Sequence, residues 1–258
     1  MNIITSFSKT NNKDCFLTYV FCLFFSTFLL DPTRYESQAA EPKNRFTEAR
    51  RRMIERDLRG RGIKDERVLA VMESVPRHLF VPEKWRASAY DDRPLPIGEG
   101  QTISQPYIVA FMTELLELQE GQKVLEVGTG SGYQTAVLAR LGVEVFSIEI
   151  VPALGERASK ILSQLGYTNA HLKVGDGFFG WEENGPFDAI LVTASAPKVP
   201  APLWRQLREG GRLLIPLGEE GRTQRLVRVR KLAGKQVVED VTGVAFVPLT
   251  GAIRKDAR

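Results

Sequence analysis

The chain has very little cysteine and histidine. Its 258 residues include only Cys15 and Cys22, and His78 and His171. The absence of cysteine after Cys22 excludes disulfides, thiolate metal ligands and cysteine nucleophiles from most of the chain. A zinc site there would consist almost wholly of carboxylates, which is rare. We therefore expect no metal site, and we interpret both histidines as surface or packing residues.

A large excess of charge of one sign is also absent. The formal net charge is +4, and much of the excess lies in residues 45–64, where acidic residues are interspersed. Phe46, Met53 and Leu58 recur there at near-helical spacing, which predicts the buried side of an amphipathic helix. The arginines then form its solvated face, and we expect no nucleic-acid partner.

Long apolar runs are missing except near the N-terminus, where residues 15–30 read CFLTYVFCLFFSTFLL after Lys9 and Lys13. The run is shorter than the ~20 residues of a usual membrane-spanning helix. Its length and basic start are typical of a signal peptide. For residues 1–30 a signal peptide, an anchor and a misassigned start remain open, and residues 31–44 are expected to be a linker. Membrane contact is expected only through residues 15–30.

Residues 45–118 are expected to hold the N-terminal helices. A second helix is predicted over Asp65–Val75, where Asp65 is a plausible N-cap and Pro76 ends the helix. A third is predicted over Tyr107–Leu118. The proline-rich stretch between them, Val75–Pro106, is expected to be loop-like.

Residues 119–258 alternate between apolar strand-like runs and amphipathic helical stretches. Such alternation predicts an α/β fold with a mostly parallel central sheet and helices on both faces. After Gly218, polar and apolar residues alternate, which predicts an antiparallel C-terminal edge. The five predicted parallel strands are Lys123–Gly128, Val143–Ile150, Ala170–Asp176, Phe187–Ala194 and Gly211–Gly218.

The first of these strands leads into a glycine turn, in VLEVGTGSGYQTAVLA (residues 124–139). The spacing Gly128-x-Gly130-x-Gly132 differs from the G-x-G-x-x-G of a dinucleotide site. Glu126 stands just ahead of the turn. A carboxylate there is a poor neighbour for a diphosphate but suits a ligand that carries an ammonium and a sulfonium, such as S-adenosylmethionine.

Two further acids end neighbouring strands, where ligands bind in open α/β sheets. Glu149 ends the second strand, where it could accept hydrogen bonds from both ribose hydroxyls. Asp176 ends the third strand within GDG, beside Gly177, where it could accept from an adenine amino group. Together with the glycine turn, these acids favour a Rossmann-like class I methyltransferase that binds S-adenosyl-L-methionine over an NAD enzyme. The predicted cofactor residues are Glu126, Gly128, Gly130, Gly132, Glu149, Asp176 and Gly177.

The methyl acceptor follows partly by exclusion. The N-P-P-Y-like tetrad of base amino-group methyltransferases is missing from VTASAPKVP (residues 192–200), and cytosine C5 methylation would need a cysteine. Neither histidine lies at a strand end where it could act as a base on an alcohol. A carboxylate needs no base, because with a pKa of roughly 3.3–3.9 it is already ionised at pH 7. It needs only alignment and partial desolvation.

Seven blocks from about Arg45 to the C-terminus closely resemble the protein-L-isoaspartate O-methyltransferase family, in the family's order. The signature block is GEGQTISQPYIVAFMTELL (residues 98–116). The others are VPRHLFVP (75–82), AYDDRPLPIG (89–98), VLEVGTGSGYQTAVLA (124–139), VGDGFFGW (174–181), PFDAILVTASAP (186–197) and FVPLTG (246–251).

The resemblance implies methyl transfer from S-adenosylmethionine to the free α-carboxylate of isoaspartyl residues in damaged proteins, which initiates their repair. It also implies that Ser104 is the active-site residue, whose hydroxyl donates to the acceptor carboxylate. Thr102 and Gln105 flank it as further substrate donors. We expect Arg77 and Arg93 to face the anionic substrate.

The resemblance suggests a monomer in the cytoplasm, where the methyl donor is made. A periplasmic or membrane-anchored location through the N-terminal run is the alternative. A small-molecule carboxyl methyltransferase of the same fold and a non-catalytic, membrane-tethered binding protein are the rival functions. The polar, proline-rich stretch before the signature block favours an extended peptide as substrate over a small molecule, and an intact cofactor set with Ser104 argues against a mere binding module.

Overall fold

The computed structural model describes residues 45–219 and 222–253. The predictions for residues 1–30 and for the linker over 31–44 lie outside the described residues. Within the two described ranges, no helix has the length and apolarity that crossing a membrane requires.

A basic helix begins the described chain. Residues 45–52 are α-helical, and the helix continues as a π-helical segment, η1 (Met53–Leu58), and a 3-10 turn, η2 (Arg59–Arg61). Met53 and Leu58 are buried, and Phe46 packs against the same core. The predicted amphipathic helix is confirmed, and most of its arginines are exposed.

The two following helices are close to their predicted positions. Helix α2 spans Glu66–Ser74, and the Asp65 carboxylate caps it by accepting a hydrogen bond from the Arg67 N–H at 2.9 Å. Helix α3 spans Pro106–Leu115, with its proline in the first turn, where the missing N–H costs no helical hydrogen bond.

The proline-rich stretch between them is more ordered than the expected loop. It forms two short 3-10 helices, η3 (Arg77–Leu79) and η4 (Glu83–Ser88), and a hairpin of β1 (Leu95–Gly98) and β2 (Gln101–Ile103). Leu95 and Ile103 pair across the hairpin and are both buried. Burial of apolar side chains therefore orders a segment that its prolines suggested would be irregular.

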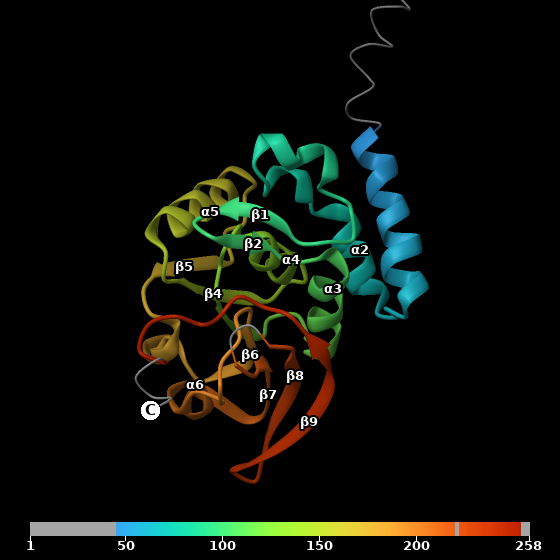
Figure 1. Cartoon of the computed structure of the whole chain (residues 1–258). Helices are drawn as coiled ribbons and strands as arrows, with labels where there is room; N and C mark the ends of the chain where they lie inside the picture. Colours follow the sequence, from blue (N-terminus) through green and yellow to red (C-terminus); the bar gives the residue numbers. More distant parts are fainter. Residues whose placement is uncertain (1–44, 220–221, 254–258) are drawn as a thin grey trace, which may run out of the picture. The chain divides into compact units, whose positions relative to one another are not determined.

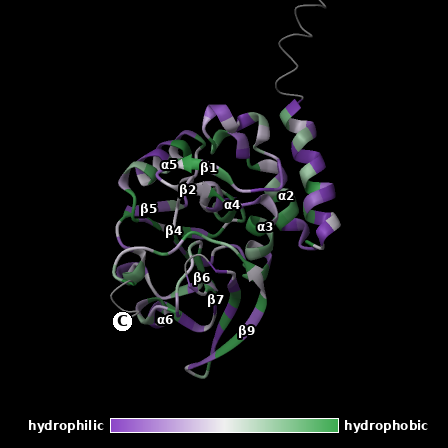
Figure 2. Ribbon diagram, viewed as in Figure 1, coloured by the Kyte–Doolittle hydropathy of each residue, from purple (hydrophilic) through white to green (hydrophobic). Residues whose placement is uncertain are grey.

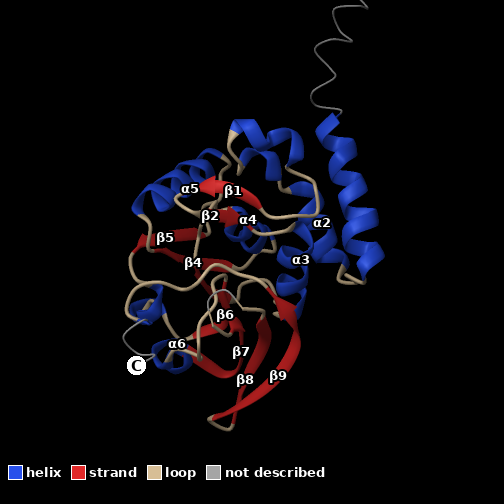
Figure 3. Ribbon diagram, in the orientation of Figure 1, coloured by secondary structure: helices blue, strands red, loops and turns tan. Residues whose placement is uncertain are grey.

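Seven strands form the central sheet, in the order β5-β4-β3-β6-β7-β8-β9. The five strands β3 to β7 are parallel to one another, and β8 and β9 add an antiparallel edge (Figure 3). The predicted α/β fold is confirmed. The strands are β3 Lys123–Val127, β4 Glu144–Glu149, β5 Ala170–Val174, β6 Phe187–Val192, β7 Leu207–Leu217, β8 Gln224–Leu232 and β9 Lys235–Val244.

Helices cover both faces of this sheet because successive strand residues point to opposite sides. Val124 of β3 packs with Met112 of α3 and Leu138 of α4 on one face. Its neighbour Leu125 packs with Leu203 of α6 on the other. Figure 2 shows the hydrophobic residues concentrated in the inner strands. The elements that connect the parallel strands are α4 Tyr133–Arg140, α5 Pro152–Gln164, η5 Gly177–Phe179, η6 Glu182–Asn184 and α6 Ala201–Gln206.

The order of the strands fixes where a ligand can bind. From β3 the chain proceeds through β4 to β5 in one direction, and then returns to place β6 on the other side of β3 (Figure 1). The sheet therefore has its switch point between β3 and β6, and ligands bind at the carboxyl ends of the strands at such a point. Gly128 follows β3 there, and Thr193 follows β6.

Candidate active site

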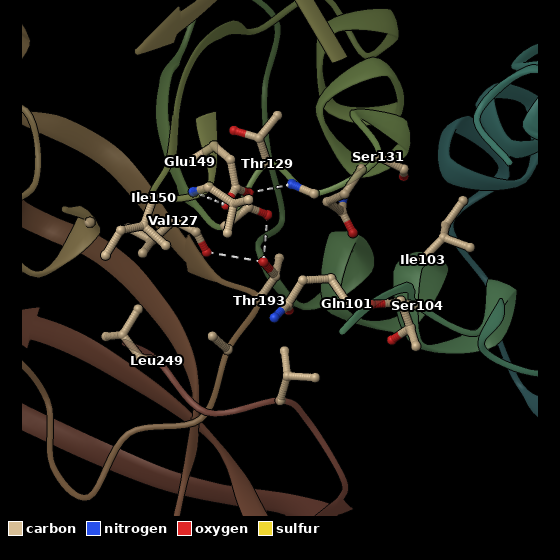
Figure 4. Close-up of a pocket in the computed structure, with 18 of the residues that line it drawn as sticks. Gln101, Ile103, Ser104, Val127, Thr129, Ser131, Glu149, Ile150, Thr193 and Leu249 are labelled. Atoms are coloured by element: carbon tan, nitrogen blue, oxygen red, sulfur yellow. Dashed lines mark hydrogen bonds between the residues drawn. The ribbon is translucent and has the colours of Figure 1, made fainter. Parts of the chain in front are cut away.

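A pocket opens at this switch point. Segments far apart in the sequence line it: the end of β2 with the following loop, the glycine turn after β3, the end of β4, the residues after β6, and Val247–Thr250. In Figure 4, Gln101, Ile103 and Ser104 lie on one side of the pocket, opposite Glu149 and Ile150. The hairpin with its following loop thus supplies one wall of the pocket, and the central sheet supplies another.

The glycine turn is shaped by contact with β6. Gly128 has φ of +100°, and a Cβ at this position would overlap the Thr193 hydroxyl. That hydroxyl donates to the carbonyl oxygens of Val127, at 3.0 Å, and Gly128, at 2.7 Å (Figure 4). Only glycine satisfies both the backbone angle and the close approach. Thr193 is a pocket residue that the sequence analysis missed.

Glu149 is fixed at the end of β4. Its side chain is largely buried, and it accepts hydrogen bonds from the backbone N–H groups of Gly130, at 2.7 Å, and Val151, at 2.9 Å. Each oxygen keeps further lone pairs for a ligand, because one carboxylate offers about four acceptor positions. The carboxylate therefore both braces the glycine turn and lines the pocket.

The GDG segment divides between two roles. Gly177 lines the pocket, and a Cβ there would overlap Val127 Cγ1. Asp176 does not line it; its carboxylate accepts from the N–H of Phe178 at 2.9 Å and of Ala252 at 2.7 Å. Asp176 thus anchors the C-terminal segment that forms one wall. Its predicted contact with adenine stays a prediction.

Glu126 lies beneath the pocket and not in its lining. It is fully buried, and its Oε2 accepts from the hydroxyls of Thr135 at 2.5 Å and Ser147 at 2.6 Å. Ser147 in turn bonds the Thr129 hydroxyl, which belongs to the glycine turn. Burial raises the pKa of Glu126 to about 7, although both hydrogen bonds lower it. Gly132 also lies outside the lining, as the residue before α4.

The loop after β2 carries the predicted substrate residues. Thr102 and Ser104 line the pocket, and among the described residues the Ser104 hydroxyl has no hydrogen-bond partner. Gln105 is turned elsewhere: its amide donates to the Asp92 carboxylate at 2.8 Å and to the Asp92 carbonyl at 3.0 Å. Its predicted contact with substrate stays a prediction.

The two arginines do not contribute to the pocket lining. The prediction that Arg77 faces an anionic substrate is wrong, because Arg77 is fully buried. Burial lowers the pKa of Arg77 to about 10, which leaves the guanidinium charged at neutral pH. Arg93 is exposed and pairs with Asp91 at 3.4 Å.

The histidines lie away from the pocket. The Nδ1 of His78 is 2.8 Å from the Tyr90 hydroxyl, and its ring stacks on Phe46. The Nε2 of His171 is 3.1 Å from a Glu144 oxygen. In the part of the chain that the structure describes, no three His, Cys, Asp or Glu side chains gather as metal ligands would.

Comparison with known proteins decides the family. The family model for protein-L-isoaspartate(D-aspartate) O-methyltransferase matches residues 48–254. A protein-L-isoaspartate O-methyltransferase 2 of Shewanella sediminis is 50% identical over 91% of this chain and 96% of its own length. A protein-L-isoaspartate O-methyltransferase of Opitutus terrae is 56% identical over 79% of this chain and 88% of its own length.

The chain belongs to the protein-L-isoaspartate O-methyltransferase family. Solved structures agree. One protein-L-isoaspartate O-methyltransferase superposes with a TM-score of 0.72 at 29% identity, over 79% of this chain and 67% of that one. A Plasmodium falciparum protein, described as a putative protein-L-isoaspartate O-methyltransferase in complex with S-adenosyl-L-homocysteine, superposes with a TM-score of 0.68 at 30% identity, over 78% of this chain and 98% of that one.

Within this family member, the structure brings most of the predicted site residues around one pocket and places the rest outside its lining. The residues that line the pocket are Thr102, Ser104, Gly128, Gly130, Glu149 and Gly177. The residues outside the lining are Gln105, Glu126, Gly132 and Asp176. Further lining residues that the sequence analysis did not single out include Ser131, Ile150, Thr193, Leu249 and Thr250.

Proposed function

We propose that the chain is a protein-L-isoaspartate O-methyltransferase that transfers a methyl group from S-adenosyl-L-methionine to the free α-carboxylate of isoaspartyl residues in damaged proteins. The observation that carries this proposal is the Ser104 hydroxyl, which lines the same pocket as Glu149 and the glycine turn and has no hydrogen-bond partner within the described ranges. It stands in a chain of this family.

The groups that line the pocket suit S-adenosylmethionine. Glu149 offers carboxylate oxygens to ribose hydroxyls, and Ile150 offers an apolar surface beside it for an adenine ring. Gly128 and Gly177 let the backbone of the lining pack closely against Thr193 and Val127, because a Cβ at either position would overlap those side chains. When bound, the cofactor supplies an electrophilic methyl group on a sulfonium.

Ser104 orients the acceptor. Its hydroxyl donates a hydrogen bond to one oxygen of the substrate carboxylate and thereby holds the other oxygen toward the methyl group. No proton has to be removed, because the carboxylate is ionised at neutral pH. Among the residues that the structure describes, the pocket lining contains no histidine, and its one carboxylate, Glu149, lies opposite Ser104 (Figure 4), which is compatible with a reaction that needs no base.

Ser104 does not act as a nucleophile under this proposal, because an attacking serine needs a neighbouring base to activate it. Its contribution is alignment, for which one directional hydrogen bond to the acceptor carboxylate is enough. Thr102, exposed at the pocket's edge, is placed to contact the peptide around the isoaspartyl residue.

The finer predictions on partners and location belong to the same proposal. We expect isoaspartyl proteins and peptides as substrates, a monomer in solution, and a cytoplasmic active domain because the methyl donor is made in the cytosol. Light scattering at micromolar concentration tests the monomer, and cell fractionation of the full-length chain tests the location.

The reaction is tested with the full chain, labelled S-adenosylmethionine, an isoaspartyl peptide and its normal aspartyl twin. We expect base-labile methyl ester on the isoaspartyl peptide alone. Ser104→Ala should reduce turnover about a hundredfold while the dissociation constant of S-adenosylmethionine stays unchanged. Ester on small carboxylic acids but on neither peptide would instead support a small-molecule enzyme.

A further inference from the structure

The loop that carries Ser104 lies between β2 and α3 and has neither ladder nor helix hydrogen bonds of its own at Ser104. Its position must therefore come from side chains elsewhere. Two charged residues of the proline-rich stretch contact it: Arg77 bonds Ser104, and Asp92 bonds the residues that follow.

Asp92 holds the residues that follow Ser104. Its Oδ2 accepts from the Gln105 amide at 2.8 Å, and its Oδ1 accepts from the Tyr107 N–H at 3.0 Å. Arg61 pairs with the same carboxylate at 2.5 Å, and its guanidinium carbon lies 3.6 Å from the centre of the Tyr107 ring. The Asp92 side chain is only 14% exposed, so these bonds are largely shielded from water.

Arg77 holds Ser104 itself. Its Nη2 donates to the Ser104 carbonyl at 2.7 Å, and its Nε donates to the Ala89 carbonyl at 2.7 Å. The guanidinium also lies 4.8 Å from the centre of the ring of Tyr133, the first residue of α4. One buried cation therefore contacts both the Ser104 loop and the helix that begins directly after the glycine turn.

We propose that Asp92 and Arg77 are positioning residues that set the Ser104 hydroxyl relative to the cofactor side of the pocket. Arg77 links Ser104 to the first residue of α4, and Asp92 fixes the residues that follow Ser104. This inference rests on the proposed function for the role of Ser104 in the chemistry. The geometry of the loop is open to a separate test that requires no catalysis.

The kinetic test uses Asp92→Asn in the full chain. The amide places an NH₂ group against the Gln105 amide and Arg61 or against the Tyr107 N–H, so at least one bond is lost. We expect kcat on the isoaspartyl peptide to fall about ten- to hundredfold. The dissociation constant of S-adenosylmethionine and the peptide KM should change less than about threefold.

Asp91→Asn is the matched control, because the neighbouring Asp91 side chain is exposed and, in the part of the chain that the structure describes, its one ion pair is with Arg93. It should keep the activity of the parent chain. Arg77→Lys keeps the charge but offers a single nitrogen for two carbonyls, and it should lower kcat as Asp92→Asn does. If Asp92→Asn does not unfold cooperatively, Gln105→Ala replaces it, with an expected loss of about three- to tenfold.

Hydrogen exchange of the peptide covering residues 99–108 reads the loop directly. Its amides should exchange at least about tenfold faster in Asp92→Asn than in the parent chain, whereas Asp91→Asn should leave them unchanged. A parent chain that makes no ester would overturn the proposed function and still leave this comparison decisive for the loop. Unchanged kcat and unchanged exchange in Asp92→Asn and Arg77→Lys would overturn the inference, as would a loss of cofactor affinity equal to the loss of kcat.

Discussion

Glu126→Gln should make the protein more stable at alkaline pH and leave it nearly unchanged at mildly acidic pH. Glu126 is fully buried, and one oxygen, Oε2, accepts both of its hydrogen bonds, from Thr135 and Ser147. The other oxygen, Oε1, has no partner within the described residues. A glutamine can keep both bonds on its amide oxygen and place its NH₂ where Oε1 stands.

The magnitude follows from the raised pKa. Burial raises the pKa of Glu126 from 4.5 to about 7, so the folded protein holds this proton more tightly than the unfolded chain. Its contribution to the free energy of unfolding is fully present below pH 4.5 and is lost as pH rises through about 7. At about 1.4 kcal/mol per pH unit of difference, the loss between pH 5 and pH 8 is about 2 to 3 kcal/mol.

Urea unfolding of both proteins at pH 5 and pH 8, without cofactor, measures this loss. The parent chain should lose about 2 to 3 kcal/mol more than Glu126→Gln between the two pH values. Taking the difference between the variant and the parent removes the contribution of all other titrating groups. Equal losses in the two proteins would refute the reasoning and would mean that Glu126 is ionised at pH 5 in the folded state.

Gly128→Ala should weaken S-adenosylmethionine binding, measured by titration calorimetry, at least about tenfold, because its Cβ would overlap the Thr193 hydroxyl at a positive φ. The control Gly175→Ala, whose Cβ would meet only Lys173 Cε at 3.9 Å, should bind the cofactor normally. Thr193→Val should cost about 1 kcal/mol of stability through the two lost hydrogen bonds, whereas Thr193→Ser should not; equal melting temperatures for both variants would contradict this. Glu149→Gln should weaken cofactor binding about tenfold or more, because its amide nitrogen opposes either the Gly130 or the Val151 N–H, and an unchanged dissociation constant would remove Glu149 from the site.

The sheet and the glycine turn could be predicted from sequence because their signals are local. An apolar run such as Lys123–Gly128 marks a buried parallel strand and its end, and the glycine turn begins at that end. The strand ends then place Glu149 and Gly177 beside the turn through the general rule for ligand sites in α/β sheets. The resemblance to a known family supplied Ser104, which nothing in its local spacing distinguishes from a capping hydroxyl.

The partners of individual side chains could not be predicted, because they depend on segments far apart in the chain. Asp176 bonds Ala252, which lies 76 residues later. Arg77 has the charge of a substrate-binding residue, but the fold buries it among backbone carbonyls. Gln105 has the chemistry of a substrate donor, but Asp92 already accepts from its amide.

Thr193 shows what a further signal could have provided. It follows the strand that pairs with β3, so a polar residue there lies beside Gly128 once the strand order is known. No local sequence pattern predicts that order, in which β6 lies next to β3. The hairpin β1–β2 was missed for a related reason, since strands of four and three residues beside prolines carry almost no periodicity.

The measurement that tests the central claim most directly uses the full chain with S-adenosylmethionine and three peptides of one sequence. One peptide carries isoaspartate, the second carries aspartate, and the third carries isoaspartate with its α-carboxylate converted to an amide. The account predicts a base-labile methyl ester on the first peptide and none on the other two. Ester on the amide-blocked peptide, or on the aspartyl peptide at the same rate as on the isoaspartyl peptide, would contradict it.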